Sequence, residues 1–167
     1  LRSLHWRALN VALAEAGYDP ISHEDHVGTF DGLPTMVKLG MLGVPDWLRE
    51  TVNYRKQIHT MAMIAQECAP DDRLLKELEK IGKEAFIAVV SNARNETCIS
   101  VLMKTGLGPH VQMLIAGPHE KPKPNPHPYI KAIEAAYLDP KQTIAIEDNH
   151  YGGQSAERAG LRCLHVA

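Results

Sequence analysis

The sequence has only three cysteines, Cys68, Cys98 and Cys163, and they lie far apart in the chain. An odd number at this spacing indicates neither a disulfide framework nor a zinc site. We therefore expect plain buried thiols in a protein of a reducing compartment, for which the cytoplasm is the simplest choice.

Long apolar runs and an excess of one charge are also missing. No apolar stretch approaches the roughly 18–20 residues needed to cross a bilayer, and the first residues, LRSLHWRALN, have no apolar signal-peptide core. The 18 basic and 20 acidic side chains leave a formal net charge of −2, which gives no field for nucleic acid or an anionic membrane. We therefore expect neither as a partner.

The first part of the chain has the pattern of helices. Apolar residues follow helical spacing over 4–16, and Gly17 is the predicted end of that helix. The stretch 46–68 is amphipathic and contains no glycine or proline, so it is predicted to be one long helix. We expect a small helical domain over residues 1–68.

The rest of the chain, 69–167, alternates between strands and helices. The continuous apolar run FIAVV is typical of a strand buried on both faces. The predicted strands are 86–90, 111–116, 143–146 and 161–166, and the predicted helices are 71–81, 95–105, 129–137 and 153–159. Such alternation indicates a parallel sheet with right-handed crossovers. The expected fold class is therefore α/β, a Rossmann-like parallel sheet core with helices on both faces, joined to the small helical domain.

Polar side chains follow three of the predicted strands. Ser91 and Asn92 follow the first strand. Lys121 follows the second, and Glu147 with Asp148 follows the third. Taken singly, each has a simpler explanation as turn chemistry or a solvated loop. Together they lie where ligands bind in an open parallel sheet, and they suit a phosphate group with a divalent cation.

Three motifs carry a resemblance to the haloacid dehalogenase superfamily. The motifs VVSNARNET, EKPKPNPHPY and IAIEDNHYGGQSAERAG resemble its second, third and fourth motifs. The likeness is greatest to the phosphatase and phosphomutase branch that includes beta-phosphoglucomutase and phosphoglycolate phosphatase. It implies a helical cap domain over 1–68, a core over 69–167, and a Mg²⁺-dependent phosphatase that acts on a small phosphorylated metabolite.

The same resemblance implies roles for single residues. Ser91 would bind the transferring phosphoryl group with help from Asn92, and Lys121 would bridge that group and the nucleophile. Lys123 is the less favoured substitute, because Lys121 opens the Lys-Pro-x-Pro pattern. The two carboxylates that follow the third strand, Glu147 and Asp148, would bind Mg²⁺, the second more directly.

Two further positions follow from the resemblance. His5 and Lys56 resemble residues that face the active site in the phosphomutases, so they would contact substrate. Lys38 and Arg55 are other cationic candidates for a distal phosphate. Asn149 stands where the family usually has serine, and either side chain can form local hydrogen bonds.

One motif of the superfamily has no counterpart here. Its first motif, Asp-x-Asp-Gly, supplies the aspartate that forms an aspartyl-phosphate and a second aspartate for acid–base catalysis. The 167 residues contain no such motif, so we expect activity to require N-terminal residues beyond them. A sugar phosphomutase and a non-catalytic binding protein or fragment of the same fold remain the alternatives.

Overall fold

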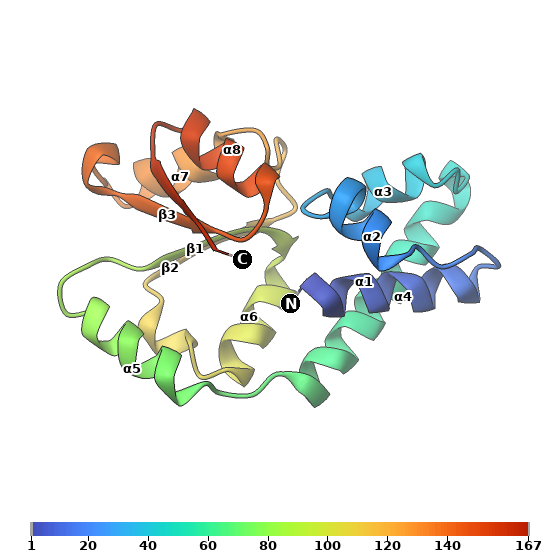
Figure 1. Ribbon diagram of the computed structural model, residues 1–167, viewed down its shortest axis with the longest axis horizontal. Helices are drawn as coiled ribbons and strands as arrows, with labels where there is room; N and C mark the ends of the chain where they lie inside the picture. Colours follow the sequence, from blue (N-terminus) through green and yellow to red (C-terminus); the bar gives the residue numbers. More distant parts are fainter. Residues whose placement is uncertain (1, 167) are drawn as a thin grey trace. The chain divides into compact units, whose positions relative to one another are not determined.

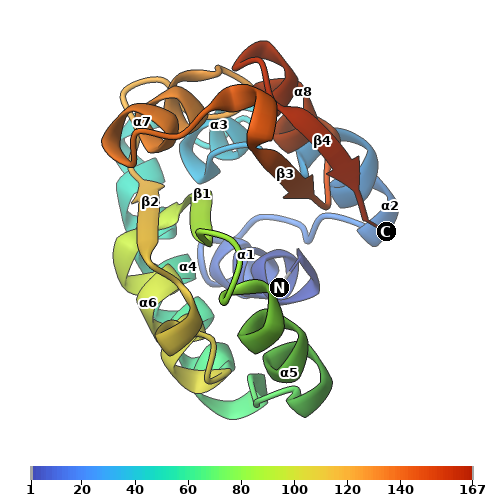
Figure 2. The same ribbon diagram turned by 90° about the vertical axis from the view of Figure 1, so that its left-hand side faces the viewer.

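The computed structural model describes residues 2–166, and the chain divides into two compact units, Leu1–Ala69 and Pro70–Ala167. In the described residues the first unit contains helices and no strand, whereas the second alternates strands with helices (Figure 1; Figure 2 shows the view at right angles). The predicted α/β fold class is confirmed. Over the same residues, no helix combines the length and the apolar character that crossing a membrane requires.

The first unit is built around two long helices that pack together, α1 and α4. Its elements are α1 (Arg2–Glu15), α2 (His23–Asp25), the π-helical turn η1 (His26–Phe30), α3 (Thr35–Met41) and α4 (Asp46–Glu67). The chain leaves α1 through Gly17, whose φ of +80° suits a residue without a side chain. The predicted helix end at this glycine is confirmed.

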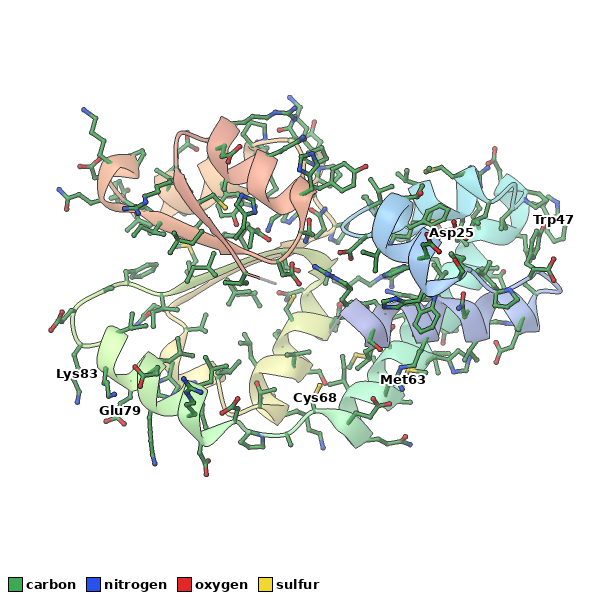
Figure 3. All side chains as sticks on the ribbon, in the orientation of Figure 1. Asp25, Trp47, Met63, Cys68, Glu79 and Lys83 are labelled. Atoms are coloured by element: carbon green, nitrogen blue, oxygen red, sulfur yellow. The ribbon has the colours of Figure 1, made fainter. Side chains whose placement is uncertain are left out.

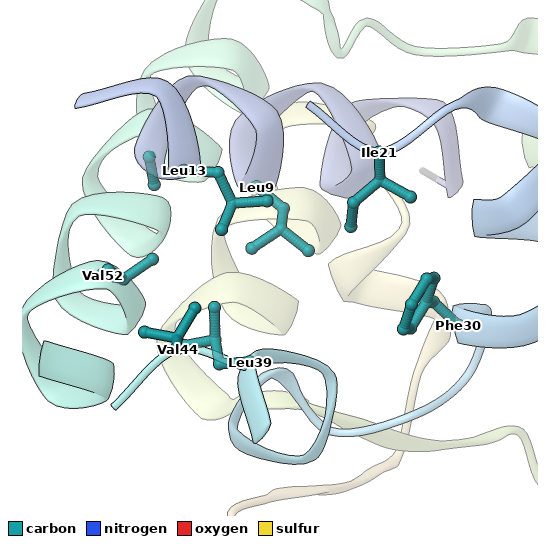
Figure 4. Close-up of a cluster of buried hydrophobic side chains, with 8 residues drawn as sticks. Leu9, Leu13, Ile21, Phe30, Leu39, Val44 and Val52 are labelled. Atoms are coloured by element: carbon teal, nitrogen blue, oxygen red, sulfur yellow. The ribbon is translucent and has the colours of Figure 1, made fainter. Parts of the chain in front are cut away.

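A single hydrophobic cluster holds these helices together. Figure 4 shows its buried members, which are Leu9, Ala12, Leu13, Ile21, Phe30, Leu39, Val44 and Val52. They come from α1, the turns between helices, η1, α3 and α4. Burying one such large apolar side chain contributes roughly 1.5–3 kcal/mol, so packing of this cluster explains why short helices are stable here.

The second unit contains two pairs of parallel strands. Strand β1 (Ala88–Arg94) pairs with β2 (Met113–Gly117), and β3 (Ile144–Glu147) pairs with β4 (Arg162–His165). The helices are α5 (Asp72–Ile81), α6 (Asn95–Lys104), α7 (His127–Ala135) and α8 (His150–Arg158), with short 3-10 turns η2 (Gly108–His110) and η3 (Pro140–Gln142). Within residues 2–166, no backbone ladder joins one strand pair to the other.

Strand β1 differs from its predicted range of 86–90. It begins later and continues to Arg94, so Ser91 and Asn92 lie inside the strand instead of after it. The predicted end was placed where the side chains become polar. Strand pairing, however, uses backbone groups, and the backbone of β1 stays in register with β2 as far as Ser91. The register then shifts before Arg94 pairs with Gly117. Such an irregularity bends a strand and re-aims its side chains.

Helix α8 also differs from its predicted range of 153–159. It begins at His150, because the Asn149 side chain accepts a hydrogen bond from the Gly152 N–H at 2.9 Å. This bond caps the helix, as expected for a residue in the place of a serine. Gly152 and Gly153 therefore lie in the first turns of the helix, although a glycine pair in a sequence usually marks a turn.

Helix α5 allows a direct test of a helix cap. Asp71 precedes it, and its Oδ1 accepts hydrogen bonds from the N–H groups of Arg73 (3.0 Å) and Leu74 (3.1 Å). Further along, Glu79 and Lys83 extend outward (Figure 3) and form an ion pair, with 3.7 Å between Oε1 and Nζ.

We expect Asp71→Ala to lower the free energy of unfolding by about 1 kcal/mol, because the N–H groups at the helix start lose their acceptor. Urea unfolding followed by circular dichroism measures this change. The exposed Glu84, just past the helix, is the control: Glu84→Ala should stay within about 0.5 kcal/mol of the parent. Equal effects of the two variants would contradict the capping role.

Candidate active site

The centre of the site is the ammonium group of Lys123, which lies in the loop between β2 and α7. Only 7% of this residue is exposed. Its Nζ donates hydrogen bonds to the Val90 carbonyl oxygen at 2.7 Å and to Oε1 of Glu147. The first acceptor is on β1 and the second ends β3. One side chain therefore brings together two strands that no backbone ladder joins.

The backbone of Lys123 is held by Asn92. The Asn92 Oδ1 accepts from the Lys123 N–H at 2.9 Å, and the Asn92 Nδ2 donates to the Lys123 carbonyl at 3.1 Å. This double contact comes from the irregular part of β1, which turns the amide toward the loop. Phosphate binding by Asn92 stays a prediction; in the structure its amide holds the backbone of Lys123.

Ser91 lies beside a histidine that has no role in the sequence-based prediction. The Ser91 Oγ accepts from the Ala93 N–H at 3.0 Å, and the Ser91 carbonyl is 2.6 Å from Nε2 of His119. A carbonyl oxygen only accepts hydrogen bonds, so the proton of His119 is on Nε2. Burial lowers the pKa of His119, which favours the neutral ring at neutral pH.

Glu147 is a buried carboxylate with two donors. It is 7% exposed, and its Oε1 accepts hydrogen bonds from the Lys123 ammonium and from the Tyr129 hydroxyl. The ammonium also lies 4.8 Å from the centre of the Tyr129 ring, a cation–π contact. Burial and the charge of Glu147 raise the pKa of Tyr129, so the hydroxyl keeps its proton and remains a donor.

Tyr129 is the site residue that the sequence analysis missed. It was placed only at the start of a predicted helix, 129–137. The sequence feature that could have indicated it is its position, because Tyr129 is the last residue of the segment EKPKPNPHPY, which contains the candidate lysines. Helix α7 begins before it, at His127, and the hydroxyl of the tyrosine contacts Glu147 at the end of β3.

Glycines allow helix α8 to approach the same carboxylate. A Cβ atom at Gly152 would lie 2.1 Å from Oε2 of Glu147, and one at Gly153 would lie 2.1 Å from Cε1 of His165. Real Cβ atoms do not come this close to other atoms. The glycine pair therefore lets the start of α8 pack directly on the end of the β3–β4 pair.

The two lysines of the proline-rich loop are in different environments. Lys121 is exposed, whereas Lys123 is buried and contacts Glu147. The pattern Lys-Pro-x-Pro occurs twice in overlap, as KPKP at 121–124 and as KPNP at 123–126. The pattern alone therefore does not choose between them, while the structure brings the second lysine into contact with Val90 of β1 and with Glu147 at the end of β3.

Asp148 is the exposed carboxylate at this end of β3. Its Oδ1 accepts a hydrogen bond from the Asn149 Nδ2 at 2.9 Å. Among residues 2–166, no three histidine, cysteine or acidic side chains are grouped closely enough to hold a metal ion by themselves. Mg²⁺ commonly uses only one or two carboxylates and keeps waters or substrate phosphate as its other ligands. A single exposed carboxylate such as that of Asp148 fits that requirement.

The other two predicted substrate-binding residues lie in the first unit. His5 on α1 and Lys56 on α4 contact each other, with 3.4 Å between Nδ1 and Nζ. Burial, reinforced by the nearby lysine charges, lowers the pKa of His5 to about 3. The imidazole is therefore neutral at neutral pH, and its Nδ1 can accept a hydrogen bond from the ammonium group.

Comparison with known proteins relates the whole described chain to one family. The model of the haloacid dehalogenase-like hydrolase family matches residues 2–166. Among solved structures, CbbY from Rhodobacter sphaeroides in complex with phosphate is 19% identical with a TM-score of 0.85, over 98% of this chain and 78% of that chain. A mutant of the same protein in complex with xylulose-(1,5)bisphosphate is 18% identical with a TM-score of 0.85.

A third similar structure is beta-phosphoglucomutase from Clostridium difficile. It is 17% identical with a TM-score of 0.85, and the match covers 99% of this chain and 78% of that chain. At identities this low, the structural similarity establishes the fold.

Proposed function

Because the chain belongs to the haloacid dehalogenase-like hydrolase family, we propose that it carries the phosphate- and magnesium-binding residues of a phosphatase for a small phosphorylated metabolite. The observation that carries this proposal is the buried ammonium group of Lys123, which contacts Val90 of β1 and Glu147 at the end of β3. A fixed positive charge at this place is what a phosphoryl group requires, because phosphoryl transfer is catalysed mainly by positioning and charge neutralisation.

The residues around this ammonium have separate tasks in the proposal. Ser91 donates its hydroxyl to a phosphate oxygen, Lys123 neutralises the charge of the phosphoryl group, and Asn92 keeps the lysine in place. Lys123 thus takes the role first expected for Lys121. Glu147 acts through the lysine that it binds. The phosphate and the sugar bisphosphate bound to CbbY support a phosphorylated metabolite as the substrate class.

Mg²⁺ would be held by Asp148, and when bound it would neutralise phosphate charge and orient the phosphoryl group. The Asp148 carboxylate is the group of this chain that presents itself to solvent for a cation, because Glu147 has its Oε1 occupied by two donors. The aspartate that would accept the phosphoryl group belongs to the first motif of the family, which the 167 residues do not contain. The tasks of the present residues are binding and orientation.

We expect Asp148→Asn to weaken Mg²⁺ binding by about tenfold or more, since removing even an outer-shell partner of a metal costs roughly that much. Isothermal titration calorimetry with the 167-residue chain measures this directly. Glu134→Gln, which removes a negative charge from an exposed residue of α7, is the matched control and should bind Mg²⁺ normally. Unchanged binding in Asp148→Asn would refute the metal assignment.

The experiment that tests the function itself is an assay for inorganic phosphate, released from a panel of small phosphate esters with and without Mg²⁺. It needs a protein that includes the family's first motif together with these residues. Release that depends on Mg²⁺ and is lost in Asp148→Asn is the expected result. Binding of the esters without any release would instead favour a non-catalytic relative.

A sugar phosphomutase is the second candidate. The contact between His5 and Lys56 in the helical unit favours it, because a mutase needs groups of the cap that hold a second phosphate. Transfer of phosphate between two positions of a sugar, detected by phosphorus NMR, would distinguish a mutase from a phosphatase, which releases inorganic phosphate.

A further inference from the structure

Helix α4 has a buried face and an exposed apolar face on opposite sides. Its buried residues are Val52, Thr60 and Ile64, and helix α1 packs against this helix. On the other side Trp47 is 79% exposed, Tyr54 64% and Ile58 50%. The Trp47 side chain extends outward near the start of the helix (Figure 3). The first unit therefore uses one face of α4 for its own core and leaves the other face open.

The exposed face forms one continuous stripe along the helix. Its members, which we call the α4 stripe, are Trp47, Thr51, Tyr54, Ile58, Met61 and Ala65. All are exposed except Met61, which is half-buried. Successive members are separated alternately by four and three residues, and side chains at this spacing are neighbours on one side of a helix. The stripe is thus a single surface.

This spacing also indicates what covers the α4 stripe. A repeat that averages 3.5 residues is that of two helices that pack lengthwise, with the side chains of each fitting between those of the other. Tryptophan and tyrosine are the side chains that most often dominate the affinity of protein interfaces. A continuous exposed apolar surface commonly marks such an interface. The partner is therefore a helix with a matching stripe.

Charges on the two flanks of the stripe select which helix this is. Glu50 lies on one flank and Arg55 on the other, and both are exposed. In a parallel pair of identical helices, each flank of one copy lies against the opposite flank of the other. Glu50 of each copy then lies opposite Arg55 of the other, so both contacts join opposite charges. An antiparallel pair centred on Tyr54 would instead place the two Arg55 side chains together.

The contacts that Arg55 already makes leave it available for this role. Its Nη1 donates to the Glu15 carbonyl oxygen at 3.2 Å and lies 3.7 Å from Oε2 of Glu15. A guanidinium group carries five N–H donors, and this side chain is 44% exposed, so further donors remain. Exposed ion pairs contribute little to affinity. The apolar stripe must supply most of the attraction, and the charges select the orientation.

We propose that two copies of this chain associate through the α4 stripe, with their α4 helices parallel and related by a two-fold axis. Each stripe residue then lies against its own copy, as in an isologous interface. The 22 residues of α4 make a helix about 33 Å long, and a single helix pair is a small interface for a specific complex. We therefore expect a reversible dimer. The proposal does not depend on the proposed function.

Sedimentation equilibrium of the 167-residue chain over a range of concentrations is the first test, and we expect a reversible monomer–dimer equilibrium. Tyr54→Glu and Ile58→Glu each place a charge at the centre of the stripe and should weaken association by about tenfold or more. Tyr137→Glu is the matched control, because Tyr137 is 95% exposed and lies past the end of α7. It should associate as the parent does. A chain that stays monomeric throughout, or equal affinities of the stripe variants and the control, would overturn the proposal.

The flank charges test the orientation and the identity of the partner. Glu50→Arg and Arg55→Glu each make both charge contacts of the parallel pair repulsive, so each variant should associate about three- to tenfold more weakly than the parent. An equal mixture of the two restores opposite charges at both contacts and should associate like the parent. Stronger association of Arg55→Glu alone would establish an antiparallel pair and reject the proposed arrangement. A mixture that associates no better than its components would also reject it.

Two controls separate loss of association from other effects. Every substituted position is exposed, so the circular dichroism of each variant should match that of the parent. Tyr54→Glu should also keep the Mg²⁺ affinity of the parent, because the stripe contributes no residue to the site around Lys123. A dimer without phosphatase activity, or a monomeric phosphatase, would each decide one proposal and leave the other intact.

Discussion

Lys123→Met should lower the free energy of unfolding by about 3–5 kcal/mol, the cost of breaking a buried ion pair by removing one partner. The reason is that Glu147 is 7% exposed and would lose its cationic partner, with the Tyr129 hydroxyl as its remaining donor. A domain has a total stability of only about 5–15 kcal/mol, so this change is a large part of it. Chemical unfolding followed by circular dichroism measures the loss.

Lys121→Met is the matched control, because it makes the same substitution two residues earlier in the same loop. Lys121 is exposed, and changes at such positions stay within about 0.5 kcal/mol. In a protein that releases phosphate, Lys123→Met should also lower the rate by about 10²-fold or more, while Lys121→Met should leave the rate nearly normal. The reverse order of effects would return the role to Lys121.

Gly152→Ala should also be strongly destabilising. Its added Cβ would lie 2.1 Å from Oε2 and 2.9 Å from Oε1 of Glu147, so the carboxylate or the start of α8 must move. Overpacking costs typically 1–3 kcal/mol, and here it also disturbs a buried ion pair, so we expect about 3 kcal/mol. Thermal unfolding measured by differential scanning calorimetry shows the size of the loss.

Gly28→Ala is the control for Gly152→Ala, because no atom lies within 4 Å of a Cβ built at Gly28. We expect it to be neutral or slightly stabilising. The double variant Gly152→Ala with Lys123→Met gives a further check. Both changes act on Glu147. The double variant should therefore lose less free energy of unfolding than the sum of the losses of the two single variants, as for residues in one network. Strict additivity would contradict a shared cause.

The sequence predicted the fold class and most element positions well, because these depend on local patterns. The apolar residues that give the helical spacing before Gly17 and the apolar run of β1 also pack in the folded protein, so the local pattern and the tertiary structure favour the same elements. The ends of elements were less predictable. Strand β1 continues through Ser91 and Asn92, since backbone pairing does not require apolar side chains.

The choice between Lys121 and Lys123 shows how far the residues of the site can be predicted from the sequence. Both fit the Lys-Pro-x-Pro pattern, and only contacts distant in sequence separate them. Lys123 is selected by the Asn92 side chain, 31 residues away, and by Glu147, 24 residues away. Tyr129 was missed for the same reason, since its partner Glu147 comes from another strand.

The ammonium group of Lys123 has a limited capacity for hydrogen bonds. It carries three N–H donors, and the Val90 carbonyl and Glu147 accept two of them. One donor is therefore left for any incoming oxygen unless an existing bond is given up. In the proposed phosphate site, recognition by this residue would therefore be monodentate, and its positive charge, rather than a forked set of bonds, would provide the attraction. An arginine, whose planar fork suits two parallel bonds, would not be an equivalent replacement.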